Sequence, residues 1–578
     1  MNKTSVFLSI ASVVAWLSCA PVLMFAQDSE SSTVSIYPQD YFRNPLNIPI
    51  TLAGNFGECR PNHYHSGLDI KTEGRENLPV FAAASGYVSR IRISASGFGN
   101  ALYITHPDGF TTLYAHLNNF APAIQKYTKD KQYELETWAV DLILYENQFP
   151  VEKGDQIAWS GNTGSSAGPH LHFEIRETST EHPLNPQLFG FKIQDTKAPV
   201  PLHLALYNAE KSLYEHTPMI IPLKGKQQTY RLQDTLMLPY NKLGMSVHVN
   251  DFMDGSQNTL NFYTASWYID GILQGKITLD DIGYEETRYL HAYVDYALRQ
   301  KRKEWFQCMF QLPGNQLNSI YSHLNADRGY LSVSIGEPAN ATIVLKDAAG
   351  NATEINFTFI LTGDTSTTAA CSVPFAYNKP NTFEHPNVRF RLSENDLYDN
   401  ICFQFAEKPR KDAFSMEYQL HTAHVPIHGY FELQIKPDKP VPFALRDKIV
   451  LVYQEDEKNI KKSAQAARFQ DGWYQARVRN FGRYYLLADT IAPVITPAFT
   501  QNAQLAQVGK LQLTVKDNLT SVASFRAELN GKWVCFVQRG NTYIYTFDEH
   551  CPKGKNTLKI TVADENNNTN IKTYTFYR

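Results

Sequence analysis

Positive charge is not in excess in this sequence, which argues against a protein that binds nucleic acid. The 578 residues include 54 lysine and arginine side chains and 57 aspartate and glutamate side chains, so the formal net charge is −3. Nucleic-acid-binding proteins usually show a basic domain or a basic stripe. We therefore expect no nucleic acid among the partners.

Cysteine is scarce and unevenly spaced. The chain has seven cysteines, of which Cys19 lies in the first segment. The others are Cys59, Cys308, Cys371, Cys402, Cys535 and Cys551. Their spacing fits neither a disulfide-stapled scaffold nor a Cys-x-x-Cys metal site. Disulfides between Cys371 and Cys402 and between Cys535 and Cys551 are left open.

Long apolar runs are absent after the first segment. Lys3 precedes an apolar run over residues 6–17, which predicts a signal peptide over residues 1–26. A lipid tether at Cys19 and an uncleaved anchor are the alternatives. No later run approaches the roughly 18 apolar residues of a membrane-spanning helix. We therefore expect an exported protein without a transmembrane helix in its mature chain.

Aromatic residues are abundant, at 13% of the chain, beside 43% hydrophobic and 19% charged residues. Aromatic side chains favour strands, and the other two fractions are those of packed globular domains. At roughly 150 residues per domain, the length predicts about four domains. The composition therefore predicts a mainly β protein.

Three phrases occur twice and predict two related β modules. Residues 195–200 (DTKAPV) are repeated as residues 489–494 (DTIAPV). Residues 247–251 are paralleled by 513–517, and residues 343–351 by 558–566, each an alternating strand that runs into an Asp, Asn or Gly turn. The last pair resembles the final hairpin of bacterial immunoglobulin-like domains. We predict β-sandwich (immunoglobulin-like) modules over residues 194–363, with insertions, and 489–578, and a β-rich domain of unknown type over 364–488.

Histidines gather in one stretch, where six of the 17 lie between residues 63 and 172. His170 and His172 alternate with apolar residues, so both imidazoles lie on one face of a strand. His65 and Asp69, four residues apart, also share a face, and Gly67 between them argues against a helix. Two imidazoles and one carboxylate are a normal ligand set for catalytic zinc. His116, in another strand-like run, is a candidate to act beside the metal.

These residues stand in motifs that resemble the lysostaphin/LytM family of zinc metallopeptidases. The motifs are Phe56-Gly57, His65-x-Gly67-x-Asp69, Tyr114-Ala115-His116-Leu117 and residues 160–174, which end in His170-Leu171-His172-Phe173-Glu174. They occur in the family's order over residues 54–177. The resemblance implies that His65, Asp69 and His172 hold one Zn²⁺ and that His116 and His170 are catalytic. It also implies a small antiparallel β-sheet domain, which we place at residues 27–193.

The same resemblance implies an exported zinc metalloendopeptidase that hydrolyses peptide crosslinks of bacterial peptidoglycan through a zinc-activated water. Its partners are then peptidoglycan stem peptides in the periplasm or cell envelope, and a cell-wall or protein partner of the C-terminal modules is left open. The alternative is a non-enzymatic or autoinhibited LytM-like scaffold that regulates other cell-wall hydrolases. The motifs state neither which peptide bond is cut nor which of His116 and His170 is the base.

Two other patterns near the histidines are rejected. Residues 164–168 fit the Gly-x-Ser-x-Gly pattern of esterases, but Pro169 and an alternating strand follow where an esterase has a helix. Cys59 as a fourth protein ligand would close the zinc site to water.

An insertion over about residues 122–150 separates His116 from the turn at Gly154, where the family usually has a short connection. Helical spacing occurs at Ile124, Tyr127 and Lys131, and again at Trp138, Leu142 and Tyr145. We expect the insertion to border the active-site groove, where a wall, a substrate-binding segment and a lid are the alternatives, and we take the wall as the hypothesis.

Overall fold

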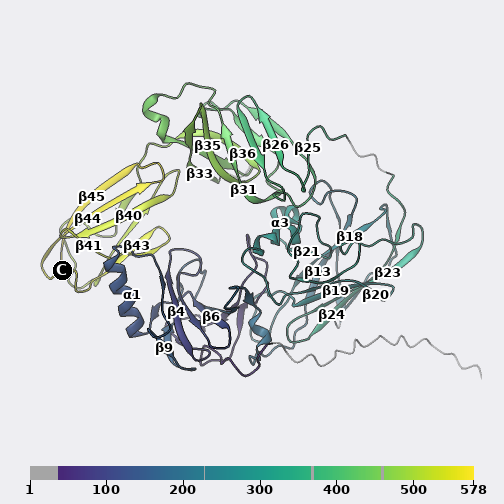
Figure 1. Ribbon diagram of the computed structural model, residues 1–578, viewed down its shortest axis with the longest axis horizontal. Helices are drawn as coiled ribbons and strands as arrows, with labels where there is room; N and C mark the ends of the chain where they lie inside the picture. The colour runs from purple at the N-terminus through teal and green to yellow at the C-terminus, as the bar shows by residue number, and fades with distance from the viewer. Residues whose placement is uncertain (1–36, 227, 366–369, 457–460) are drawn as a thin grey trace, which may run out of the picture. The chain divides into compact units, whose positions relative to one another are not determined.

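The computed structural model describes residues 37–578 apart from residues 227, 366–369 and 457–460. The predicted signal peptide and Cys19 lie outside the described residues. Within them, strands far outnumber helices (Figure 1), so the predicted mainly β fold is confirmed. No helix in this described part has the length and apolar character needed to cross a membrane.

The histidine-rich stretch forms one large and one small antiparallel sheet. Their strands are β1 (Leu52–Gly54), β2 (Leu68–Lys71), β3 (Pro79–Phe81), β4 (Gly86–Ile93), β5 (Asn100–Thr105), β6 (Phe110–Ala115), β7 (Asn119–Phe120), β8 (Val140–Ile143), β9 (Pro150–Val151), β10 (Gln156–Trp159), β11 (His170–Glu177) and β12 (Pro183–Leu184). The large sheet has the order β1-β2-β11-β6-β5-β4-β8, with β12 on β11 and β9 on β4, and the small sheet has the order β3-β10-β7. The short 3-10 helix η1 (Pro186–Leu188) follows β12.

Strand β11 lies between β2 and β6, and its register positions the predicted site. His172 is opposite Asp69 on β2 and opposite Ala115, the residue before His116, on β6. Gly67, just before β2, permits this close approach, because a Cβ there would lie 2.3 Å from the carbonyl oxygen of Phe173. The pairing thus brings residues from three separate motifs together at one end of β11.

The insertion begins as predicted and then departs from the prediction. Helix α1 (Pro122–Glu134) starts at Pro122, whose fixed φ suits a first helical turn, and it buries Ile124 and Thr128. The second predicted helix is wrong, since residues 140–143 form β8, which pairs with β4. The open edge of β4 offers backbone hydrogen bonds that outweigh the weak helical spacing there.

The next part of the chain, residues 200–361, packs two sheets around one core. Its elements are β13 (Val200–Asn208), β14 (Met219–Pro222), β15 (Gly225–Lys226), β16 (Thr229–Arg231), β17 (Leu236–Leu238), β18 (Leu243–Asn250), β19 (Thr264–Ile269), β20 (Ile272–Thr278), η2 (Thr287–Tyr289), α2 (Leu290–Tyr293), α3 (Tyr296–Arg302), β21 (Phe306–Cys308), β22 (Tyr321–Leu324), β23 (Pro338–Lys346) and β24 (Ala352–Leu361). The sheet orders are β14-β13-β18-β21 and β15-β16-β24-β23-β19-β20-β22, with β17 on β24. We call this part the first module.

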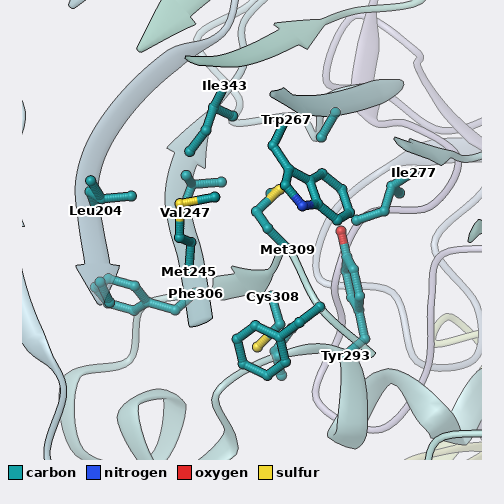
Figure 2. Packing of buried hydrophobic residues seen from close by; sticks show 14 of the residues in the cluster. Leu204, Met245, Val247, Trp267, Ile277, Tyr293, Phe306, Cys308, Met309 and Ile343 are labelled. Carbon is teal, nitrogen blue, oxygen red and sulfur yellow. The ribbon is translucent and has the colours of Figure 1, made fainter. Parts of the chain in front are cut away.

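Figure 2 shows the core of the first module, in which Val247 from one sheet and Trp267 and Ile343 from the other belong to one buried cluster. Strand β23 alternates buried and more exposed side chains, as the sequence predicts for a half-buried strand. The cluster also contains Phe56 and Tyr64 from the histidine-rich stretch. The two parts of the chain therefore share one hydrophobic core.

Five further sheets are described in the rest of the chain, three in residues 374–488 and two in the last module. Residues 374–488 contain β25 (Pro374–Phe375), β26 (Asn381–His385), β27 (Val388–Leu392), β28 (Ile401–Cys402), β29 (Phe405–Lys408), β30 (Glu417–Leu420), β31 (Pro426–Ile435), η3 (Phe443–Lys448), β32 (Ile449–Gln454), β33 (Lys462–Ala466), β34 (Arg468–Gln470), β35 (Trp473–Asn480) and β36 (Gly482–Ala488). The last module contains β37 (Val494–Pro497), β38 (Ala503–Gln504), β39 (Lys510–Lys516), β40 (Val522–Leu529), β41 (Lys532–Trp533), β42 (Val537–Arg539), β43 (Thr542–Thr546), β44 (Lys555–Asp564) and β45 (Thr569–Tyr577). Each part has its own buried core.

The structure contains one of the two disulfides that the sequence left open. Cys371 and Cys402 are bonded, whereas Cys535 and Cys551 are free thiols. Cys551 packs in the core of the last module, and Cys535 is not part of that core.

Candidate metal centre and active site

The three predicted ligands meet at one point. His65 Nε2 lies 3.0 Å from Asp69 Oδ1 and 3.0 Å from His172 Nδ1, and His172 Nδ1 lies 2.9 Å from Asp69 Oδ1. All three side chains are buried. A tetrahedral zinc ion with bonds of about 2.0–2.1 Å holds its ligand atoms about 3.3 Å apart. The triangle needs only a small widening to fit that ion, and its two nitrogens and one oxygen are a catalytic donor set.

The remaining ring nitrogens orient both imidazoles. His65 Nδ1 lies 2.7 Å from the carbonyl oxygen of Asn55, and His172 Nε2 lies 2.8 Å from Glu174 Oε1. Because both oxygens are acceptors, each of these nitrogens donates and the opposite nitrogen directs its lone pair into the triangle.

The three groups are electrostatically coupled. Burial lowers the pKa of His65 to about 4. Burial also acts to lower the pKa of His172, but its hydrogen bonds with Asp69 and Glu174 outweigh this and raise it to about 9. Burial alone would raise the pKa of Asp69, yet the neighbouring histidines hold it well below its usual range. The triangle therefore favours one positive charge between its donors, and a metal cation can take the place of that proton.

His116 and His170 flank the triangle. His170 Nε2 lies 3.3 Å from Asp69 Oδ1, and its Nδ1 lies 2.8 Å from the carbonyl oxygen of Gly168. His116 Nδ1 lies 2.8 Å from the carbonyl oxygen of Thr163, and its ring centroid lies 4.7 Å from that of His170. His116 has a φ of +58°, a left-handed conformation that is strained for a non-glycine residue and typical of functional sites. Burial, with the charges of His172 and His170, lowers the pKa of His116 to about 3, so its imidazole is neutral.

All five predicted site residues line one cavity of about 880 Å³. Its lining also includes His63 and Phe98, together with Asn258 and Tyr284 from the first module. None of residues 122–150, all of which are described, lines this cavity, so the predicted wall is wrong.

Helix α1 instead contacts the last module. Lys129 Nζ lies 2.9 Å from Glu549 Oε1, and the rings of Tyr133 and His550 stack with centroids 3.9 Å apart. Opposite charges and an aromatic stack therefore direct the insertion away from the cavity.

Several residues that the sequence did not single out support the triangle. Arg60 Nη2 donates to Asp69 Oδ2 at 2.7 Å, which leaves Oδ1 for the triangle. Glu174, fully buried behind His172, also accepts hydrogen bonds from Arg176 Nε at 2.7 Å and from the Tyr284 hydroxyl at 2.9 Å. Glu174 shares the polar face of β11, so its spacing could have revealed it. Arg60 lies in a loop and Tyr284 in another module, where no local pattern marks them.

The rejected ligand and the esterase pattern take no part in the triangle. Cys59 packs in the core shared with the first module and is absent from the described cavity lining. Residues 165–168 line the cavity, and β11 follows them at His170.

Comparisons with known proteins match the part of the chain that holds this site. Residues 63–134 and 128–186 match the model of Peptidase family M23, and residues 372–489 match that of the Zu5-like domain. The DD-carboxypeptidase/endopeptidase Mpg of Neisseria meningitidis serogroup B is 34% identical over 122 residues, which are 21% of this chain and 22% of Mpg. The murein hydrolase activator NlpD of Salmonella dublin is 29% identical over 157 residues, which are 27% of this chain and 34% of NlpD. The catalytic domain of lysostaphin from Staphylococcus simulans is 26% identical, with 23% of this chain and 87% of that domain covered and a TM-score of 0.17.

The matched segment holds the triangle and both flanking histidines. Residues 63–186 therefore form a Peptidase family M23 domain of the lysostaphin/LytM type, as the motifs predict. The chain spans only about a fifth to a third of the length of these two curated relatives.

Proposed function

We propose that this chain is an exported zinc metalloendopeptidase that hydrolyses peptide crosslinks of bacterial peptidoglycan in the periplasm or cell envelope. The observation that carries the proposal is the triangle of His65, Asp69 and His172, with edges of 2.9–3.0 Å. Zinc bound there would supply a water with a pKa of about 7 and polarise the scissile carbonyl. The name of the relative Mpg, a DD-carboxypeptidase/endopeptidase, supports the substrate class.

The other residues have separate roles in this proposal. Arg60 holds Asp69 so that one carboxylate oxygen faces the ion. Of His116 and His170, one accepts a proton from the attacking water and the other donates to the oxyanion that develops on the peptide. The carbonyl oxygens of Thr163 and Gly168 hold these two rings in place.

A non-enzymatic or autoinhibited scaffold is the second candidate. One relative is a murein hydrolase activator, and Tyr284 of the first module lies at the cavity and binds Glu174 behind His172. In this case the domain would act through contacts with other hydrolases, and cleavage would be absent or blocked.

Digestion of purified peptidoglycan, with products identified by mass, tests both candidates. We expect the zinc-loaded chain to release crosslink fragments and a chelator to abolish their release. His172→Ala should lose zinc and activity together, whereas His116→Ala should keep zinc and lose about 10²-fold or more in rate. Zinc-loaded protein that releases no product would favour the scaffold, and loss of zinc in His116→Ala would contradict the assigned roles.

A further inference from the structure

Both β modules carry the same group of three aspartates. The first aspartate cluster is Asp195, Asp251 and Asp347, and the second is Asp489, Asp517 and Asp564. In each cluster, one carboxylate oxygen per residue lies within 4.8 Å of the others. The members occupy equivalent places. Asp195 and Asp489 begin the repeated proline phrase. Asp251 directly follows β18 as Asp517 follows β39, and Asp347 directly follows β23 while Asp564 ends β44.

An asparagine orients each cluster in the same way. Asn351 donates from its backbone to Asp347 Oδ1 at 2.8 Å and from Nδ2 to Oδ2 at 2.7 Å. Asn568 makes the same two bonds to Asp564, at 2.8 and 2.7 Å. The side-chain amides also reach the backbone oxygen of Asp195 at 3.3 Å and of Asp489 at 3.0 Å. The duplication therefore extends from the sequence to the hydrogen bonds that position the carboxylates.

The central aspartate of each cluster has an unsatisfied oxygen. Asp251 is only 2% exposed, and its Oδ1 has no hydrogen-bond partner among the described residues. Asp517 Oδ1, at the equivalent place, is also buried without a partner in the described part of the chain. Burial of a carboxylate oxygen without a partner is costly, and its repetition at one structural position is typical of a cation-binding site.

A lysine close to the first aspartate cluster makes its hydrogen bond elsewhere. Lys197, two residues after Asp195, directs its ammonium group to the carbonyl oxygen of Met253 at 2.9 Å.

We propose that the first and second aspartate clusters each bind one Ca²⁺ ion. Oxygen-only donors suit a hard cation rather than zinc. Oxygens about 2.3–2.6 Å from a central Ca²⁺ can be up to about 4.6–5.2 Å apart, which covers the spread in both clusters, whereas Mg²⁺ requires about 2.1 Å and near-ideal octahedral geometry. Each ion ties the segment that enters a module to the module itself, at Asp195 and at Asp489. The two sites are independent of the proposed peptidase activity.

Calorimetric titration of the full zinc-loaded chain with CaCl₂ tests the proposal. We expect two binding events with dissociation constants on the order of 10⁻⁴ to 10⁻³ M, as in extracellular Ca²⁺ modules, and a higher unfolding temperature with Ca²⁺ than with chelator. Asp251→Asn should remove one event, Asp517→Asn the other, and the double variant both. Asp234→Asn, which changes an exposed aspartate of the first module, is the matched control and should retain both events.

The unmodified chain provides a test that does not depend on the folding of any variant. Absence of both the heat and the thermal shift at millimolar Ca²⁺ would overturn the proposal, as would full binding in the double variant. An equal response to Mg²⁺ would overturn the choice of cation.

Discussion

Replacing Glu174 with glutamine removes a buried negative charge and nearly preserves the shape of the side chain. Glu174 is fully buried, and its carboxylate accepts from His172 Nε2 at 2.8 Å and from Arg176 Nε at 2.7 Å. It therefore sets the orientation of a proposed zinc ligand and balances a guanidinium that is itself 4% exposed.

Two effects of Glu174→Gln follow, and they differ in size. Loss of a partner of this kind behind a zinc-bound histidine typically weakens metal binding about 10- to 100-fold, or about 1.4–2.7 kcal/mol. Loss of one member of a buried ion pair costs about 3–5 kcal/mol of folding stability, because Arg176 keeps a desolvated charge. We expect a folded chain of reduced unfolding temperature that releases zinc to a weaker chelator than the unmodified chain does.

Competition with a fluorescent zinc chelator measures the first effect, and thermal unfolding measures the second. Glu181→Gln is the matched control, because Glu181 lies 3.9 Å from the same Arg176 but its side chain is 68% exposed. An exposed pair contributes about 0–1 kcal/mol, so this variant should match the unmodified chain. Zinc affinity of Glu174→Gln within about twofold of the unmodified chain, or an equal loss in Glu181→Gln, would refute the reasoning.

Three further outcomes are expected. Tyr284→Phe removes a hydroxyl that donates to Glu174 at 2.9 Å, and it should lower the free energy of unfolding by about 1.5–3 kcal/mol in urea titrations; an unchanged midpoint would show that the contact contributes nothing. The folded pKa of Asp251 is raised to about 8, above its unfolded value of about 3.9, so the folded chain holds the extra proton and its Ca²⁺-free stability should fall as the pH rises from about 4 to 8. Unfolding temperatures in chelator should show this slope, with a smaller one in Asp251→Asn, and equal slopes would contradict the shift. Truncation after residue 193 should expose Phe56 and Tyr64 and give a chain that aggregates or unfolds at a lower temperature in light-scattering and calorimetric scans; unchanged unfolding would contradict the shared core.

The candidate site could be predicted because its signals are local. His170 and His172 are two residues apart on β11, so the strand period alone places them on one face. His65 and Asp69 are only four residues apart, although His65 lies in the loop before β2 and not on the strand. The meeting of the pairs depends on the register of β11 against β2, which is a non-local pairing. From the sequence, the prediction that both pairs contribute to one zinc site rests on the resemblance of the motifs to a known family.

The two wrong predictions for the insertion concern features that contacts with distant parts of the chain determine. Helical spacing at Trp138 and Leu142 predicted a helix, but residues 140–143 form a strand that pairs with the open edge of β4. The expected wall failed because Lys129 on α1 pairs with Glu549, 420 positions away in the sequence. No periodicity within the insertion encodes either partner.

The peptidase domain and the first module are coupled in two physical ways. Phe56 and Tyr64 are at most 2% exposed and belong to the core cluster of the module, and fully burying an apolar side chain contributes about 1.5–3 kcal/mol. Against a typical total stability of about 5–15 kcal/mol, separation of the two parts would remove a large share of the folding free energy. The second link is polar, since Tyr284 of the module binds Glu174, which in turn binds His172. A movement of the module would therefore change the hydrogen bonding of a proposed zinc ligand, which a passive spacer would not do.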